Sequence, residues 1–122
     1  MTLERYELGI VGEDLAVDVL AGRGYAILER RFRTDHGEID IIALDGDTLV
    51  FVEVRAKATD ECGTAAESVT RQKQRRVIRM ATAYLACHGA VDRPCRFDVV
   101  AIDNALSEEP HITVYPGAFE AF

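Results

Sequence analysis

Two acidic residues and an arginine stand among apolar residues in the segment 37–57, GEIDIIALDGDTLVFVEVRAK. Asp40 lies in one apolar run, and Glu53 and Arg55 lie in the next. The residues DGD at 45–47 separate the two runs and predict a β-hairpin. Carboxylate oxygens are the ligands that Mg²⁺ and Mn²⁺ prefer. The pattern therefore predicts a divalent-metal site if the hairpin brings the two acids together.

The position of the turn decides where Asp40 lies relative to Glu53. A two-residue loop at 45–46 pairs Asp40 with Phe51, whereas a loop at 46–47 pairs Asp40 with Glu53. Both registers place the two carboxylates on one face, with roughly 5 to 8 Å between side-chain origins. Only a three-residue loop separates them. Two buried carboxylates this close repel each other, and a metal cation is the expected compensation.

The two faces of the predicted hairpin differ in polarity. One face is wholly apolar and should pack on a helix: Ile39, Ile41, Ala43, Val50, Val52 and Val54. The other face is apolar near the turn and charged at its far end, where Asp40, Glu53 and Arg55 lie. The alternative interpretation of this charged end is a strand end that reaches solvent and carries a surface ion pair.

Hydrolysis of a phosphodiester with metal ions requires carboxylate ligands, a cation near the phosphate and a positioned water molecule. Glu13, in the first predicted helix, is a third candidate ligand, and its alternative role is that of a solvent-facing helix residue. Arg55 is the candidate phosphate-binding cation, and its alternative role is an ion pair. Asp98 is expected to pair with Arg96 or with a helix residue, without a catalytic role.

The basic residues are clustered, although the chain has a net charge of −7. An acidic total argues against a protein that simply coats nucleic acid, but it does not exclude a local basic patch. Spacing of four residues places several of these side chains along one helix face. The candidate nucleic-acid-binding residues are Arg30, Arg31, Arg33, Lys57, Arg71, Lys73, Arg75, Arg76 and Arg79.

Length and composition indicate one domain that spans residues 1–122. No apolar run approaches the roughly 20 residues needed to cross a bilayer, and no secretory signal is visible, so we expect a cytoplasmic protein without a membrane partner. The three cysteines, Cys62, Cys87 and Cys95, form no CxxC pair. They are expected to be reduced, each as a small buried or neutral residue.

Hydrophobic periodicity predicts two helices and five strands. The helices are expected at 6–23 and 65–88, the second split near 69–70 with Thr70 as an N-cap. The strands are expected at 25–33, in the two arms of the hairpin, at 95–102, and in a short segment at 111–115 before an irregular tail; 58–63 is a polar loop. The order αβββαβ plus a short C-terminal strand predicts a three-layer α/β/α domain with a mixed sheet.

Five motifs together closely resemble the YraN-like family of bacterial proteins. They are GEDLA at 12–16, GYAILERRFR at 24–33, GEIDIIALDGDTLVFVEVR at 37–55, GTAAESVTRQKQRR at 63–76 and RFDVV at 96–100. The resemblance covers nearly the whole chain. That family is similar to a branch of the PD-(D/E)xK nuclease superfamily, related to archaeal Holliday-junction resolvases. The resemblance implies a restriction-endonuclease-like core.

The resemblance also implies roles for individual residues. It places the metal-binding pair at Asp40 and Glu53, the helical acid at Glu13 and the basic helix position at Lys73. The superfamily pattern has a lysine two residues after the second acid, where this chain has Arg55. Arginine stays protonated in proteins, so it can stabilise a phosphate but cannot act as a general base.

Two functions are consistent with this pattern. The first is a Mg²⁺- or Mn²⁺-dependent endonuclease that acts on DNA, including branched or structured DNA. Resolving a four-way junction symmetrically would favour a homodimer with two-fold symmetry. The second is a nucleic-acid-binding or protein-interaction module that retains the nuclease fold without cleavage.

Overall fold

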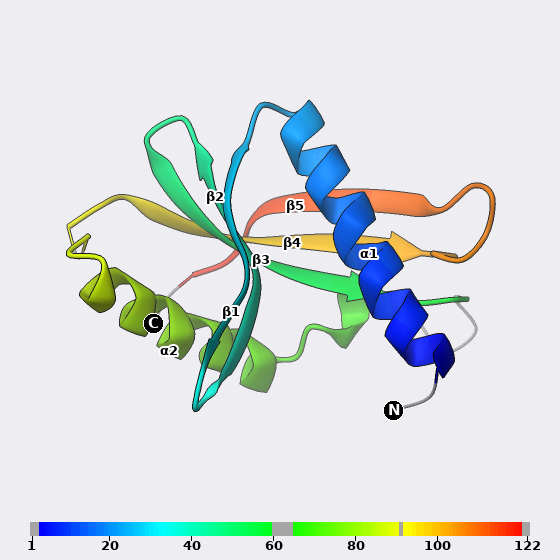
Figure 1. Ribbon diagram of the computed structural model, residues 1–122, viewed down its shortest axis with the longest axis horizontal. Helices are drawn as coiled ribbons and strands as arrows, with labels where there is room; N and C mark the ends of the chain where they lie inside the picture. The colour runs from blue at the N-terminus through cyan, green and yellow to red at the C-terminus, as the bar shows by residue number, and fades with distance from the viewer. Residues whose placement is uncertain (1–2, 60–64, 91, 121–122) are drawn as a thin grey trace.

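The computed structural model describes residues 3–59, 65–90 and 92–120, with side chains from residue 7 onward. The described residues form two α-helices, one short 3₁₀ turn and five strands (Figure 1). Their bounds are α1 Leu3–Gly22, β1 Ala26–Thr34, β2 Gly37–Asp45, β3 Thr48–Ala56, the 3₁₀ turn η1 Ala66–Ser68, α2 Arg71–Cys87, β4 Cys95–Asp103 and β5 His111–Phe119.

The five strands form one mixed sheet in the order β1-β2-β3-β4-β5. Strands β1, β2 and β3 form an antiparallel meander. Strand β4 pairs with β3 in parallel because the chain returns through α2 before it re-enters the sheet. Strand β5 pairs with β4 in antiparallel orientation. The predicted mixed sheet and element order are confirmed.

The sheet has a hydrophobic core on each face, and one helix covers each core (Figure 1). Residues of α1 pack with alternate residues of β2 to β4: Ala16, Leu20, Ile41, Ala43, Val50, Val52, Val100 and Ile102. Residues of α2 pack with the opposite set: Ile42, Leu49, Phe51, Val77, Met80, Ala81, Tyr84 and Phe97. The predicted three-layer α/β/α arrangement is therefore confirmed.

The second helix begins as the sequence predicts. The chain makes the short 3₁₀ turn η1 and then starts α2, and the Thr70 side chain at the N-cap accepts a hydrogen bond from the Lys73 backbone N–H at 3.2 Å. A threonine here satisfies one of the N–H groups that the first helical turn leaves unpaired. Within the described parts of the chain, no helix combines the length and the apolar character needed to cross a membrane.

One prediction about the end of an element is wrong. Strand β5 continues through Phe119, beyond the predicted end at Tyr115, because after an irregularity it pairs with β4 again, Phe119 with Phe97. Cys87 and Cys95 are free, as expected, and of the two roles expected for them the buried one does not apply, since they lie exposed at the end of α2 and the start of β4. Cys62 and most of the predicted polar loop lie outside the described residues.

A glycine lets α1 approach β3 closely. A Cβ atom on Gly12 would lie 2.7 Å from the Cβ of Ala56, closer than packed side chains allow. Glycine costs about 1 kcal/mol relative to alanine inside a helix. At Gly12 this loss of helix propensity accompanies the close contact between α1 and β3. The next residue along α1 is Glu13, and the close approach thus places its carboxylate beside the end of β3.

A buried ion pair links three strands, β2, β4 and β5, with Tyr25 just before β1 at the opposite end of the sheet. Asp98 is 0 % exposed and accepts hydrogen bonds from the Tyr25 hydroxyl, the Arg96 guanidinium and the Gly117 backbone N–H. Burial and the bond to Asp98 raise the pKa of Tyr25 to about 12. Arg96 also contacts the Asp45 carboxylate at 3.0 Å. The expectation that Asp98 pairs with Arg96 is confirmed.

Replacing Asp98 should destabilise the fold strongly. Asp98→Ala leaves a guanidinium and a hydroxyl without their buried acceptor, so we expect it to lower the free energy of unfolding by about 3 to 5 kcal/mol. The matched control is Asp45→Ala, which removes the exposed partner of the same Arg96 and should cost about 1 kcal/mol or less. Urea denaturation of both variants measures the difference. Equal decreases in the free energy of unfolding would show that the buried contacts of Asp98 stabilise the fold no more than the exposed contact of Asp45.

Candidate active site

The hairpin between β2 and β3 adopts the second of the two predicted registers. Asp45 pairs with Thr48 and Ile41 pairs with Val52, so the loop consists of residues 46–47. Gly46 has φ +61°, a left-handed conformation that glycine adopts at little cost. Continuing this register by one residue places Asp40 opposite Glu53.

Strand alternation breaks at Asp40. Ile39 packs with Ile42 in the core under α2, whereas Ile41 packs in the core under α1. The prediction that Ile39 shares a face with Ile41 is therefore wrong. The cause is local: β1 pairs on both sides of this point, Arg30 with Ile41 and Phe32 with Ile39, while the intervening Arg31 has φ +55°. The backbone twists out of regular strand geometry where the candidate acid lies.

Asp40 and Glu53 are costly to ionise together, because both carboxyl groups are buried and their negative charges repel each other. The pKa of Asp40 is raised to about 8, mainly by burial and secondly by the negative charge of Glu53. A hydrogen bond from the Val54 N–H at 2.8 Å opposes this shift. Burial also raises the pKa of Glu53, against the opposing charges of Arg55, Arg76 and Lys73. The two carboxylates are therefore close enough for the charge of Glu53 to act on Asp40.

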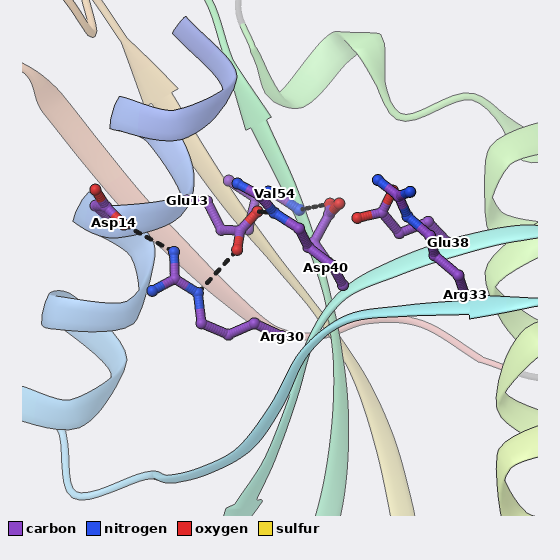
Figure 2. A network of polar contacts seen from close by, with 8 residues as sticks. Glu13, Asp14, Arg30, Arg33, Glu38, Asp40 and Val54 are labelled. Carbon is purple, nitrogen blue, oxygen red and sulfur yellow. Dashed lines mark hydrogen bonds and ion pairs between the residues drawn. The ribbon is translucent and has the colours of Figure 1, made fainter. Parts of the chain in front are cut away.

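Glu13 joins the site from α1, but its carboxylate is already bound. Its side chain is 9 % exposed, and its oxygens contact Arg30 Nε at 2.8 Å and Arg31 Nε at 2.9 Å. Arg30 also contacts the Asp14 carboxylate at 2.7 Å, so it links two acids of the helix (Figure 2). Glu13 is buried rather than solvent-facing, and it lies close enough to Asp40 for its charge to contribute to the raised Asp40 pKa.

A pocket of about 610 Å³ opens over these residues. Its walls come from the first half of α1 and from β1, β2 and the end of β3. The polar side chains that line it are Glu13, Arg31, Arg33, Glu38, Asp40 and Arg55. Glu53 itself does not line this pocket. A space of this size lined by acidic residues and arginines can accept a phosphate group together with a small cation.

Arg55 is held between Glu53 and Ser68. Its guanidinium lies 3.5 Å from Glu53 Oε1, and its Nε donates to the Ser68 hydroxyl at 3.0 Å. The Ser68 hydroxyl donates in turn to the Ala65 carbonyl at 2.6 Å. Lys73 Nζ donates to the Ser68 carbonyl at 3.1 Å. Ser68 therefore fixes two cations near one acid, and no sequence motif marked this serine in advance.

The basic residues of α2 divide into two groups. Lys73 and Arg76 lie on the side of the helix near the core, and both act on Glu53. Burial and the charge of Arg55 lower the pKa of Lys73. A Cβ atom on Gly37 would lie 3.3 Å from Arg76 Cδ, which shows that Arg76 packs on the start of β2. Arg76 is nevertheless exposed, as are the other three, Arg71, Arg75 and Arg79.

The remaining predicted residues lie around the site at different depths. Arg33 pairs with Glu38 at 3.3 Å at the pocket wall, where Figure 2 shows the two side chains together. Lys57 follows the end of β3, and its backbone N–H donates to Ile102 at 2.9 Å. Lys57 does not line the pocket.

The donor chemistry of Asp40 and Glu53 fits a hard divalent cation. Mg²⁺ is commonly bound through one or two carboxylates and keeps several water ligands, so this pair is sufficient. A cation between the two oxygen donors would also remove the repulsion that raises the Asp40 pKa. A third acid is not free to join: Glu13 is tied to two arginines. Across the described ranges, no three His, Cys, Asp or Glu side chains converge in a metal-binding group.

The sequence matches a family model described as "Uncharacterised protein family UPF0102" over residues 12–102. The UPF0102 protein of Geotalea uraniireducens (strain Rf4) is 51% identical over 108 residues, or 86% of this chain and 85% of that protein. The UPF0102 protein of Moorella thermoacetica (strain ATCC 39073 / JCM 9320) is 47% identical over 120 residues, or 98% and 100%. The chain belongs to the UPF0102 family, which confirms the family resemblance seen in its motifs. Glu13, Asp40 and Glu53 all lie within the matched region.

Replacing Asp40 should stabilise the protein at alkaline pH. A carboxyl whose pKa rises on folding, here from 3.8 to about 8, binds more protons in the folded state, so stability falls as pH increases across that interval. Asp40→Asn cannot ionise, and we expect it to raise the free energy of unfolding at pH near 8 by about 1 to 3 kcal/mol. Urea denaturation between pH about 4 and 8 should show a flatter profile for this variant.

The control for this experiment is Asp47→Asn, which removes an exposed acid from the turn of the same hairpin. It should follow the wild-type pH profile. A wild-type stability that stays level or increases over the same interval, relative to Asp40→Asn, would contradict the burial and repulsion assigned to Asp40.

Proposed function

We propose that this member of the UPF0102 family is a divalent-metal-dependent endonuclease that hydrolyses DNA phosphodiester bonds. The observation that carries the proposal is the pair Asp40 and Glu53: Asp40 lines the polar pocket, Glu53 is buried, and the negative charge of Glu53 helps to raise the pKa of Asp40. Natural sequences retain such a destabilising arrangement mainly where a site needs it.

The residues around the pair fit defined roles in this reaction. Asp40 and Glu53 would hold Mg²⁺ or Mn²⁺, which when bound supplies Lewis-acid stabilisation of charge on the phosphate. The Val54 N–H orients one oxygen of Asp40. Arg55, held by Ser68, offers its remaining N–H groups to the phosphate in the pocket. Because arginine stays protonated, Arg55 stabilises charge and does not remove a proton.

The charges around the pocket favour a nucleic-acid backbone as the substrate. Arg31, Arg33 and Arg55 line the pocket, and the exposed basic residues of α2 can contact phosphates further along the strand. Contacts of this kind position a backbone without reading bases. We therefore propose recognition of DNA structure, with branched DNA included, rather than of sequence. The location in the cytoplasm and a two-fold dimer belong to the same proposal.

Loss of either acid should abolish cleavage. Purified protein incubated with Mn²⁺ and with flap, four-way-junction, duplex or single-stranded DNA should cut at least one of these substrates. Asp40→Asn and Glu53→Gln should each reduce the rate about 100-fold or more, because each removes a metal ligand. Asp47→Asn, in the distant turn of the same hairpin, should cut like wild type. Cleavage that persists in both site variants would assign the activity to another site or to a contaminant.

Arg55 should contribute through its charge. Arg55→Gln should lower the cleavage rate about 100-fold, within the range for loss of one donor to transition-state charge. Arg55→Lys keeps the charge and should stay within about tenfold of wild type. Arg23→Gln, which changes an exposed arginine just after α1, is the control. Single-turnover rates compare the four proteins, and an Arg55→Gln variant as fast as wild type would exclude this role.

The second candidate is a module that binds nucleic acid or a protein partner and does not cleave. The structural observation that favours it is the capture of Glu13 by Arg30 and Arg31, which reduces the acids available for catalysis. Such a module requires no metal. Calorimetric titration with Mn²⁺ distinguishes the two candidates: binding that Asp40→Ala removes supports the enzyme, and the lack of any binding supports the module.

A further inference from the structure

Each oxygen of the Glu13 carboxylate is held by a different arginine. Oε1 accepts from Arg30 Nε at 2.8 Å, and Oε2 accepts from Arg31 Nε at 2.9 Å. The carboxylate is nearly buried, so few water molecules compete for it. In this state Glu13 is near Asp40, but each of its oxygens already has a guanidinium beside it, and that positive charge opposes the approach of a divalent cation.

The two arginines are not equivalent. Arg30 has a second anchor on Asp14 at 2.7 Å, and it does not line the pocket. Arg31 lines the pocket together with Asp40 and Arg55, and its side chain is 45 % exposed. An anion that enters the pocket therefore meets Arg31, whereas Arg30 remains outside.

The backbone at Arg31 is also unusual. Its φ of +55° is left-handed, which costs a residue with a Cβ atom about 1 to 2 kcal/mol. This conformation lies at the point where the β1–β2 pairing skips from Arg30 to Phe32. An observed strained residue inside a candidate site supports a functional role for its side chain.

We propose that Arg31 is an exchange residue that couples phosphate binding to assembly of the metal site. In the free protein it holds Glu13 Oε2. When a backbone phosphate enters the pocket, Arg31 moves to the phosphate, for which a guanidinium offers paired N–H donors, and Oε2 becomes available to the divalent cation. Arg30 stays on Oε1 and keeps the carboxylate oriented.

This inference rests on the proposed function, because it requires the pocket to accept both a metal and a phosphodiester. It adds a prediction that the enzyme assignment alone does not make. Since coupling between two ligands is reciprocal, phosphate should strengthen metal binding and metal should strengthen phosphate binding. If the metal site were incomplete until a phosphate binds, hydrolysis could begin only after the substrate has entered the pocket.

The first test measures Mn²⁺ affinity by calorimetry without DNA. Arg31→Asn removes the guanidinium but tolerates the left-handed backbone, and we expect it to bind Mn²⁺ about tenfold more tightly than wild type. In a Glu13→Gln background the same change should give only about a two- to threefold gain, the effect of removing one nearby positive charge. Arg31→Gly is the second variant, because glycine also adopts this φ. Thermal denaturation confirms that each protein is folded.

The second test uses sulfate as a tetrahedral stand-in for phosphate. Mn²⁺ titrations in sulfate and in chloride at equal ionic strength, corrected for free Mn²⁺, should show tighter binding in sulfate for wild type. Arg31→Asn should bind Mn²⁺ equally in both salts. Equal affinities in the two salts for wild type would overturn the phosphate half of the exchange.

The outcomes separate this inference from the proposed function. If wild type binds Mn²⁺ and Arg31→Asn gains nothing, or gains equally in both Glu13 backgrounds, the exchange is wrong and the metal site stands. If neither wild type nor Arg31→Asn binds Mn²⁺, the proposed metal site is wrong and the exchange fails with it.

Discussion

The repulsion between Asp40 and Glu53 is the constraint on which the rest of the site depends. Two acids that share a buried environment are costly to ionise together, and burial is the main reason why the Asp40 pKa rises to about 8. The surrounding residues compensate only in part: Val54 donates one hydrogen bond to Asp40, and Arg55, Arg76 and Lys73 act on Glu53. The electrostatic cost that remains is the basis of the proposal that a divalent cation binds here.

The fold brings this arrangement about through small local departures from regular structure. Gly12 allows α1 to lie against β3, which carries Glu13 to the sheet. The left-handed Arg31 and the break in alternation at Asp40 occur on neighbouring strands, β1 and β2, beside the acids. The 3₁₀ turn before α2 then supplies Ser68 as an anchor for Arg55 and Lys73. Each departure is local, while the regular core on both sheet faces keeps them in place.

The sequence predicts the framework well because periodicity records burial. Alternation in β2 and β3 and the helical spacing in α2 reflect two apolar cores, and Thr70 marks the start of α2 through its hydrogen bond to Lys73. Prediction from the sequence fails where tertiary contacts override periodicity. Nothing in the motif around Ile39 predicts that it changes face, and β5 extends past Tyr115 only because β4 offers a partner.

In the candidate site too, the sequence predicts some features, whereas others depend on tertiary contacts. Turn geometry was enough to bring Asp40 and Glu53 together, although it left two registers open. The sequence does not predict the partners of Glu13, because its pairing with Arg30 and Arg31 depends on how α1 crosses β1. Sequence spacing treats the basic residues of α2 as one surface, whereas in the structure Lys73 and Arg76 act on Glu53, and Arg71, Arg75, Arg76 and Arg79 are all exposed.

The most direct test of the central claim is the anomalous scattering of a crystal soaked in Mn²⁺. The claim is that Asp40 and Glu53 share one divalent cation. The account predicts an anomalous peak within coordination distance, about 2.2 Å, of a carboxylate oxygen from both residues. A peak elsewhere in the molecule, or a fully soaked crystal with no peak between these two side chains, would contradict it.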